Sequence, residues 1–155
     1  MKNLTYQNLT EDAKRQICAW KYEGEYALYN LPSYEELQAR QMGFMNVDAE
    51  QNYYGFWDGS VFVGYIKLME KETAVSIGIG VKPELCGKQY GQHMLSMACT
   101  LAQQLYPQKP LCLEVRTWNT RAIKCYEKVG FRIDGPAYEL TTEIGSGTFY
   151  RMVKG

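Results

Sequence analysis

The sequence has no excess of charge, no long apolar run and no closely paired cysteines, and each absence excludes a class of protein. Its 17 lysines and arginines balance 17 aspartates and glutamates, so no overall field attracts nucleic acid or an acidic membrane. No apolar stretch approaches the ~20 residues that span a bilayer. Residues 1–6 lack the apolar core of a signal peptide. The sequence therefore predicts a cytoplasmic protein that binds neither nucleic acid nor membrane.

The five cysteines form an odd set without a CxxC pair. A disulfide framework needs an even number, and structural zinc sites typically use closely spaced pairs. We therefore predict no metal site, and reduced thiols that behave as small buried hydrophobes. The only histidine, His93, is predicted to lie on the surface. Without a histidine nearby, an acyl-cysteine route through Cys112 or Cys125 is disfavoured.

A length of 155 residues suits one compact core, so we predict a single domain over residues 1–155. Residues 22–30 are predicted to be a loop or frayed helix. Helices separated by runs of strands indicate an α+β fold, or α/β by a looser convention, with a mixed sheet. Alternation and capping signals predict strands at 4–8, 53–57, 61–69, 74–81, 111–116, around 131–140 and at 148–153, and helices at 11–20, from Tyr34 through Gln41 toward Met45, at 93–102 and from 119 or 120 to 129.

A candidate anion site follows the strand at 74–81. Residues 81–95 form a strand end, a loop with glycines and a helix start. Such a junction directs backbone N–H groups and the positive end of a helix dipole at one point. Gly87 and Gly91 let the backbone approach phosphate oxygens, and Lys88 adds positive charge. A plain strand-to-helix turn is the alternative.

This loop resembles the coenzyme A loop of the GNAT superfamily of N-acetyltransferases, whose usual form is Arg/Gln-x-x-Gly-x-Gly/Ala. Gly87, Tyr90 and Gly91 are kept, whereas Cys86 replaces the basic or amide residue and Gln89 replaces the first motif glycine. Backbone amides do most of the anion binding at such a loop. The resemblance implies that acetyl-CoA is bound by Gly87, Lys88, Gln89, Tyr90, Gly91 and Gln92.

Residues 113–131 resemble the closing signature of the same superfamily, a strand followed by Asn-x-x-Ala-x-x-x-Tyr-x-x-x-Gly-Phe. Ala122 and Tyr126 are four residues apart and so share one helical face. The resemblance implies that Tyr126 faces the thioester and that Asn119 binds the pantetheine arm. The alternatives are an aromatic core residue for Tyr126 and a helix cap for Asn119.

The resemblance also implies the GNAT fold, a mixed and mostly antiparallel sheet of about seven strands with four helices. Strands four and five splay apart in that fold, so backbone N–H groups of the fourth strand bind the acetyl carbonyl and pantetheine. We assign this role to an amide at Ile79 or Val81. Gly78 and Gly80 suit a bulge in the strand, and relief of crowding is the alternative.

Acetyl transfer to an amine needs a proton acceptor and a proton donor. Tyr126 is the candidate general acid, because a phenol stays protonated at neutral pH. Glu114 is the candidate base, because alternation along 111–116 places it opposite the leucine face. The Leu-Glu-Val-Arg segment around it resembles that of bacterial ribosomal-protein alanine N-acetyltransferases. The alternatives for Glu114 are an ion pair with Arg116 or a solvent-facing charge. In either case the amine would be deprotonated through water.

Aromatic and acidic residues gather between the first two predicted helices, and they suit an amine through cation–π and charge attraction. Packing over the sheet is the alternative. These aromatic and acidic residues are Trp20, Tyr22, Glu23, Glu25, Tyr26, Tyr29 and Tyr34.

The predicted function is an N-acetyltransferase acting on a primary amine of a small molecule or a protein N-terminus. A sensor or interaction module that binds acyl-CoA without turnover is the alternative. The oligomeric state is left open, although homodimers are common in the superfamily.

Overall fold

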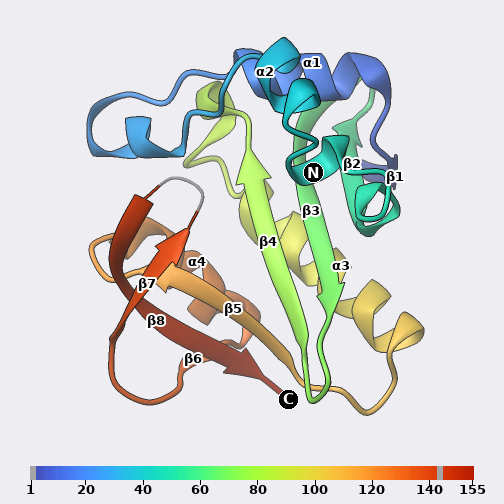
Figure 1. Ribbon diagram of the computed structural model, residues 1–155. Coiled ribbons are helices and arrows are strands. Elements are labelled where there is room, and N and C mark those ends of the chain that lie inside the picture. Colours follow the sequence, from blue (N-terminus) through green and yellow to red (C-terminus); the bar gives the residue numbers. More distant parts are fainter. Residues whose placement is uncertain (1–2, 143–144) are drawn as a thin grey trace. The chain divides into compact units, whose positions relative to one another are not determined.

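The computed structural model describes residues 3–142 and 145–155 (Figure 1). The chain divides into two compact units. Unit 1 comprises Met1–Lys67 and Ile79–Tyr90, and unit 2 comprises Leu68–Gly78 and Gly91–Gly155. Each unit is described by itself below. The single domain stays a prediction.

Within the described residues, eight strands form one sheet in the order β1-β2-β3-β4-β5-β8-β6, and β7 pairs with β8. Strand β4 runs parallel to β5, whereas β1 with β2, β2 with β3 and all partners of β8 are antiparallel. This mixed sheet with four α-helices confirms the predicted α+β class. The strands are β1 (Leu4–Asn8), β2 (Tyr53–Asp58), β3 (Val61–Glu70), β4 (Val75–Val81), β5 (Leu111–Arg116), β6 (Arg132–Ile133), β7 (Tyr138–Thr142) and β8 (Gly145–Lys154), and the helices are α1 (Glu11–Ala19), α2 (Tyr34–Ala39), α3 (Tyr90–Leu105) and α4 (Thr120–Val129).

The sheet has one strand more than the predicted seven, because residues 131–140 do not form one continuous strand. They contain β6, a turn, and the start of β7. Gly135 lies in that turn with a φ of 85°, a left-handed conformation that interrupts an extended strand.

Helices α1 and α2 of unit 1 begin at the hydroxyl caps that the sequence predicts. Thr10 Oγ1 accepts from the Ala13 N–H at 3.1 Å, and Ser33 Oγ accepts from the Glu36 N–H at 3.2 Å. Each cap satisfies one N–H that lacks a partner within the helix.

The predicted continuation of α2 toward Met45 is wrong. The helix ends at Ala39, and Gln41 follows with a φ of 51°. A left-handed residue stops the α-helix, and Gly43–Met45 forms a separate short 3₁₀ helix, η2.

Unit 1 has an aromatic core between its two helices and the strands β2 and β3. Trp20 stacks on Phe62 with ring centroids 5.8 Å apart and lies 6.1 Å from Tyr65. The Trp20 side chain is buried, so it belongs to the core. The buried members of the cluster are Ala13, Ile17, Cys18, Trp20, Leu37, Phe44, Met45, Tyr53 and Phe62.

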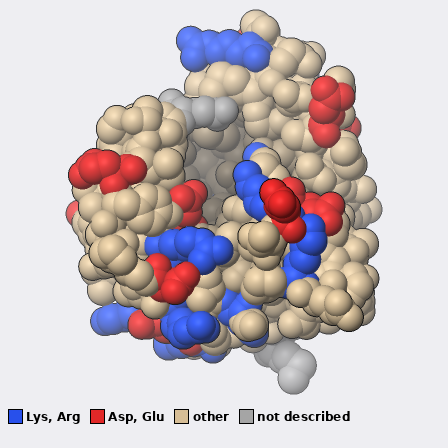
Figure 2. Space-filling view, turned by 60° about the horizontal axis from the view of Figure 1, so that its bottom comes forward, with Lys and Arg blue, Asp and Glu red and all other residues tan. Residues whose placement is uncertain are grey.

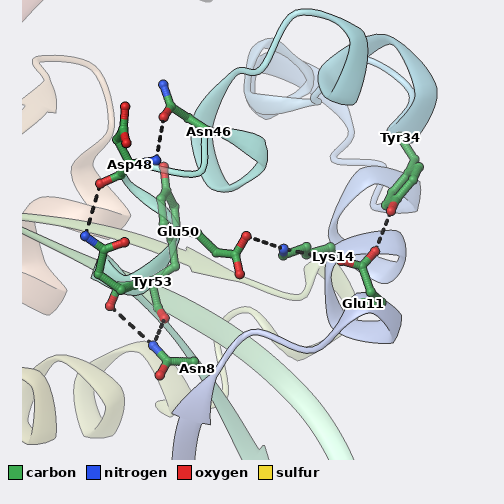
Figure 3. Close-up of polar contacts among 9 residues, drawn as sticks. Asn8, Glu11, Lys14, Tyr34, Asn46, Asp48, Glu50 and Tyr53 are labelled. Carbon is green, nitrogen blue, oxygen red and sulfur yellow. Dashed lines mark hydrogen bonds and ion pairs between the residues drawn. The ribbon is translucent and has the colours of Figure 1, made fainter.

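A buried lysine is paired with acidic groups beside this core (Figure 3). Lys14 on α1 is only 4 % exposed, and its Nζ lies 3.4 Å from Glu11 and 3.3 Å from Glu50. The Tyr34 hydroxyl of α2 donates to the other oxygen of Glu11, and this hydrogen bond lowers the pKa of Glu11. The Lys14 charge needs these acidic partners, because an uncompensated buried charge would be costly. The contacts thereby join α1 to α2 and to the segment before β2.

In unit 2, strands β7, β8 and β5 lie side by side (Figure 1). Leu111, Leu113 and Val115 of β5 are buried on one face of this sheet. Helix α4 ends at Gly130, whose φ of 107° gives the left-handed cap that the sequence predicts. Lys154 Nζ adds a 2.7 Å hydrogen bond to the Val129 carbonyl at the end of the same helix.

A glycine in β4 is required by the packing of unit 1. A Cβ atom on Gly80 would lie 2.4 Å from Tyr65 Cε1 and 2.8 Å from Tyr65 Cζ. The Tyr65 ring is held among Trp20, Phe44 and Tyr53, so it has little room to move. Gly80 thus fits the alternative that it relieves crowding, and a bulge in β4 stays a prediction.

We expect Gly80→Ala to lower the free energy of unfolding by about 1–3 kcal/mol, the usual cost of overpacking. Chemical denaturation with circular dichroism measures this loss. The control is Tyr65→Leu, which shortens the side chain opposite. If the crowding account holds, Gly80→Ala costs less in the Tyr65→Leu background than in the wild type, and equal costs would refute it.

Candidate functional site

The ladder between β4 and β5 is short. It joins Val75 to Leu111 and Ser76 to Cys112, whereas β5 continues to Arg116. Ile77 and Gly78, which are the last residues of β4 in unit 2, have no partner in β5 within the described ladder. The parallel pair therefore opens after two residues, as the predicted splay requires.

At the end of β4 in unit 1, the N–H and the carbonyl of one peptide group are both hydrogen-bonded. The Lys82 N–H donates to the Val63 carbonyl of β3 at 2.8 Å. The Val81 carbonyl, on the opposite side of this trans peptide, accepts from the Tyr22 hydroxyl at 2.6 Å. Since the N–H and C=O of one strand residue point to the same side, the Val81 N–H also faces away from β3.

The loop between β4 and α3 contains a left-handed turn. A short 3₁₀ helix, η4 (Pro83–Leu85), follows Lys82, and Gly87 and Gln89 have φ values of 80° and 70°. Gly87, Lys88 and Gln89 are exposed. Left-handed residues before a helix start turn successive N–H groups toward one side, which is an anion-binding arrangement. Gln89 therefore adopts the conformation for which the motif has glycine.

The side chains at the two ends of this loop are directed into the protein. Cys86 Sγ lies 3.8 Å from the Val81 carbonyl oxygen and 3.7 Å from that of Lys82. The Tyr90 hydroxyl donates to Asp58 at the end of β2 at 2.5 Å, and this bond raises the pKa of Tyr90. Tyr90 therefore offers a ligand its backbone rather than its hydroxyl.

Helix α3 starts at Tyr90, three residues before the predicted start at His93. Gly91 and Gln92 are thus the first helical residues of unit 2, half-buried, where backbone N–H groups lack partners within the helix. His93 is exposed, as predicted.

The candidate base Glu114 lies on β5 in unit 2 and is exposed. The Tyr138 hydroxyl of β7 donates to Glu114 Oε2 at 2.5 Å. Arg116 instead donates to the carbonyls of Gly145 and Ser146 at 3.4 Å, and no ion pair with Glu114 is found among the described residues.

Tyr138 is a partner of the candidate base that the sequence did not reveal. It pairs with Phe149 of β8, which pairs in turn with Arg116 of β5, and the Arg116 guanidinium lies 4.8 Å from the Phe149 ring. This row across three strands sets the position of Tyr138. Burial, and then the hydrogen bond to Glu114, raise the pKa of Tyr138 above the ordinary value. The phenol thus stays a proton donor to the carboxylate through neutral pH.

Asn119 and Tyr126 lie at the start and on the body of α4 in unit 2. Asn119 is 8 % exposed, and its Oδ1 accepts from the Ala122 N–H at 3.2 Å, so it is a helix cap. Tyr126 and Ala122 are half-buried on the helix, and Tyr126 is not part of the fully buried core.

The aromatic segment between α1 and α2 divides into core and surface residues. Trp20 is buried, and Tyr22 and Tyr34 are partly buried and pack against the core cluster of unit 1, so these three fit the packing alternative. Glu23 and Glu25 are exposed. Residues 22–39 contain four glutamates and no lysine or arginine.

Charges of both signs intermix on the face drawn in Figure 2, which has no broad area of a single sign. Among the described residues there is no group of three or more histidine, cysteine or acidic side chains placed to hold a metal ion. No helix in the described part of the chain has the length and apolar content to cross a bilayer.

The mixed α+β sheet, the opening of the β4–β5 pair and the left-handed loop before α3 fit the acyl-transferring class that the sequence predicts. The profile of the Acetyltransferase (GNAT) family matches residues 7–131. Because the match covers most of the chain, the protein belongs to this family, and the predicted family and enzyme class are confirmed. No curated protein sequence matches this chain.

Solved structures of similar fold include three acetyltransferases. A GNAT-family acetyltransferase from Bacillus anthracis has a TM-score of 0.79 at 13 % identity, covering 99 % of this chain and 95 % of that one. Spermidine N-acetyltransferase from Vibrio cholerae, in complex with CoA and spermine, has 0.77 at 21 %, covering 97 % and 94 %. The ribosomal-protein-S18-alanine N-acetyltransferase from Escherichia coli has 0.67 at 18 %, covering 98 % and 93 %. At such identities the likeness concerns the fold.

The residues of the loop fit an acyl-CoA diphosphate. The positive φ values at Gly87 and Gln89 and the start of a 16-residue helix supply oriented N–H groups, and Lys88 supplies an exposed cation. A Cβ atom on Gly87 would meet nothing within 4 Å, so its space is open. Cys86 is directed to the backbone carbonyls of Val81, at the end of β4, and Lys82, so its replacement of the basic residue does not obstruct the turn.

We expect Glu114→Gln to lower the pKa of Tyr138 while leaving it above the ordinary tyrosine value. The variant removes the carboxylate that disfavours the phenolate, whereas burial, the largest cause of the shift, remains. Carbon-13 NMR of labelled tyrosine rings measures the change, with Tyr138→Phe to assign the signal. Glu72→Gln, in the exposed β3–β4 turn, is the control and should leave it unaltered. An identical Tyr138 titration in wild type and Glu114→Gln would contradict the contact.

Proposed function

We propose that this protein transfers the acetyl group of acetyl-CoA to a primary amine by direct attack. The observation that carries the proposal is the left-handed turn at Gly87 and Gln89 directly before α3. Membership of the GNAT family gives the reaction type. The residues proposed to bind acetyl-CoA are Ile79, Val81, Gly87, Lys88, Gln89, Tyr90, Gly91, Gln92, Asn119 and Tyr126.

Donor binding is assigned to backbone groups rather than to charged side chains. The Val81 N–H faces away from β3, which suits a donor to the acetyl carbonyl or to pantetheine. Backbone N–H groups at residues 87–92 would bind the diphosphate, assisted by Lys88. An oriented N–H stabilises the oxyanion that develops during acyl transfer without reorganising.

Two side chains of unit 2 are assigned to proton transfer. Glu114 would accept a proton from the ammonium group, because an alkyl amine with a pKa of about 10 is mostly protonated at neutral pH. Tyr138 would orient the carboxylate through its hydrogen bond. Tyr126 would donate a proton to the departing thiolate.

We propose a cationic amine as the acceptor. The segment between α1 and α2 offers exposed Glu23 and Glu25 with no basic residue from 22 to 39. Carboxylates and tyrosine rings attract ammonium groups. Polyamines are the first class to test, given the similar fold of the spermidine N-acetyltransferase from Vibrio cholerae, and peptides with N-terminal alanine are the second, given that of the ribosomal-protein-S18-alanine N-acetyltransferase from Escherichia coli.

A cytoplasmic location is part of the same proposal. All five cysteines are free, which favours a reducing compartment. Burial raises the pKa of Cys18, Cys99 and Cys125, so these thiols are poor nucleophiles and suit a structural role. A homodimer stays a prediction.

Thiol release from acetyl-CoA, measured against a panel of polyamines, peptides and amino sugars, tests this function. We expect turnover with at least one amine, and we expect Tyr126→Phe to lower it about 10- to 1,000-fold by removing the general acid. Tyr150→Phe, on β8 opposite Val115, is the control and should keep the wild-type rate. Binding of acetyl-CoA without turnover on any amine would favour the sensor module instead, and an unchanged rate in Tyr126→Phe would remove its acid role.

We expect Glu114→Gln to lower turnover at neutral pH, with a loss that shrinks as the pH approaches the amine pKa of about 10. At that pH much of the amine is already neutral, so the base is needed less. A pH-rate profile of kcat/KM measures this, and Glu72→Gln is the matched control. A loss that is independent of pH would indicate a structural role for Glu114.

A further inference from the structure

Tyr22 forms a contact across unit 1 that the proposed mechanism does not use. It lies just after α1, and its hydroxyl donates to the Val81 carbonyl at 2.6 Å over a separation of 59 residues. This carbonyl belongs to the last residue of β4. The Lys82 N–H on the other side of the peptide is bound to Val63. The peptide is therefore fixed from both sides, directly before the loop that turns into α3.

Tyr22 is itself held in place by the loop that it starts. Asn30 Oδ1 accepts from the Tyr22 N–H at 2.7 Å, and Asn30 Nδ2 donates to the Tyr22 carbonyl at 3.3 Å. The Tyr29 ring meets the Tyr22 ring edge-on, with centroids 6.4 Å apart. Residues 22–30, which include the 3₁₀ helix η1 (Gly24–Tyr29), thus form a closed loop with one hydroxyl directed at β4.

The Val81–Lys82 peptide influences two parts of the proposed donor site. Val81, which supplies the carbonyl of this peptide, also carries the N–H that faces away from β3. The following carbonyl, of Lys82, accepts from the Leu85 N–H at 2.9 Å and so starts the η4 turn that leads to Gly87. A rotation of this peptide would therefore move both the strand edge and the loop.

We propose that Tyr22 is a positioning residue for the acyl donor, because its hydroxyl fixes the Val81–Lys82 peptide and so links the 22–30 loop to the affinity for acetyl-CoA. This proposal rests on the proposed function, since it takes residues 79–92 as the donor site. Tyr22 contributes no proton and no direct ligand contact. It keeps the strand edge and the turn in the geometry that binds.

Calorimetric titration of the full chain with acetyl-CoA tests the link. We expect Tyr22→Phe to weaken binding about 3- to 10-fold, which is what one neutral hydrogen bond contributes. Asn30→Ala, which releases the Tyr22 backbone, should act in the same direction. The double variant should lose less than the product of the two single losses, because both act through one contact.

Tyr6→Phe is the matched control. Tyr6 lies on β1 in the same unit and packs against Tyr54 and Phe56, so this variant removes a tyrosine hydroxyl away from β4. Its affinity for acetyl-CoA should equal that of the wild type. Thermal unfolding of each variant, followed by circular dichroism, shows that the protein titrated is folded.

The outcomes separate this inference from the proposed function. If the folded wild type does not bind acetyl-CoA, the proposed function fails. If the wild type binds and Tyr22→Phe binds equally or more tightly, the positioning role is wrong while the function stands. If Tyr22→Phe does not fold, Asn30→Ala decides, and unchanged affinity in that variant overturns the proposal.

Discussion

The left-handed backbone at Gln89 is the constraint on which the proposed donor site depends. A residue with a Cβ atom in this conformation costs on the order of 1 kcal/mol or more, and it persists only where the surroundings determine it. Cys86 is directed at the carbonyls of Val81 and Lys82 before the turn, and Tyr90 binds Asp58 after it. Both ends of the turn are therefore fixed, which explains how glutamine takes the place of the motif glycine.

Much of the fold could be predicted from the sequence because local signals set the element boundaries. Three helix ends can be predicted because each depends on only one or two residues close in the sequence. They are the hydroxyl caps at Thr10 and Ser33 and the glycine cap at Gly130. The predictions fail where the backbone leaves a regular conformation for reasons outside the pattern. Gln41 ends α2 early, which neither alternation nor propensity indicates. Gly135 divides the expected late strand within an Asp134-Gly135-Pro136 run, which is a turn signal that outweighs the alternation around it.

The site was predictable only in its backbone part. Glycines and spacing indicated the turn before α3, but three tyrosine hydroxyls complete the surroundings of the candidate residues. Tyr22 binds the Val81 carbonyl, Tyr90 binds Asp58, and Tyr138 binds the candidate base. Each contact joins residues at least 24 positions apart. The sequence indicated Tyr22 and Tyr90 as candidates but carries no signal for the acceptor that each hydroxyl binds, and it did not indicate Tyr138. Strand pairing in three dimensions decides which hydroxyl meets which acceptor.

The central claim is that residues 87–92 bind the diphosphate of acetyl-CoA. The most direct measurement compares acetyl-CoA with S-acetylpantetheine, which lacks the diphosphate and the nucleotide, by calorimetric titration of natively folded protein. The account predicts saturable binding of acetyl-CoA and binding of S-acetylpantetheine that is at least about 100-fold weaker, since several charge-assisted hydrogen bonds are lost. Equal affinity for the two ligands, or no binding of acetyl-CoA, would contradict it.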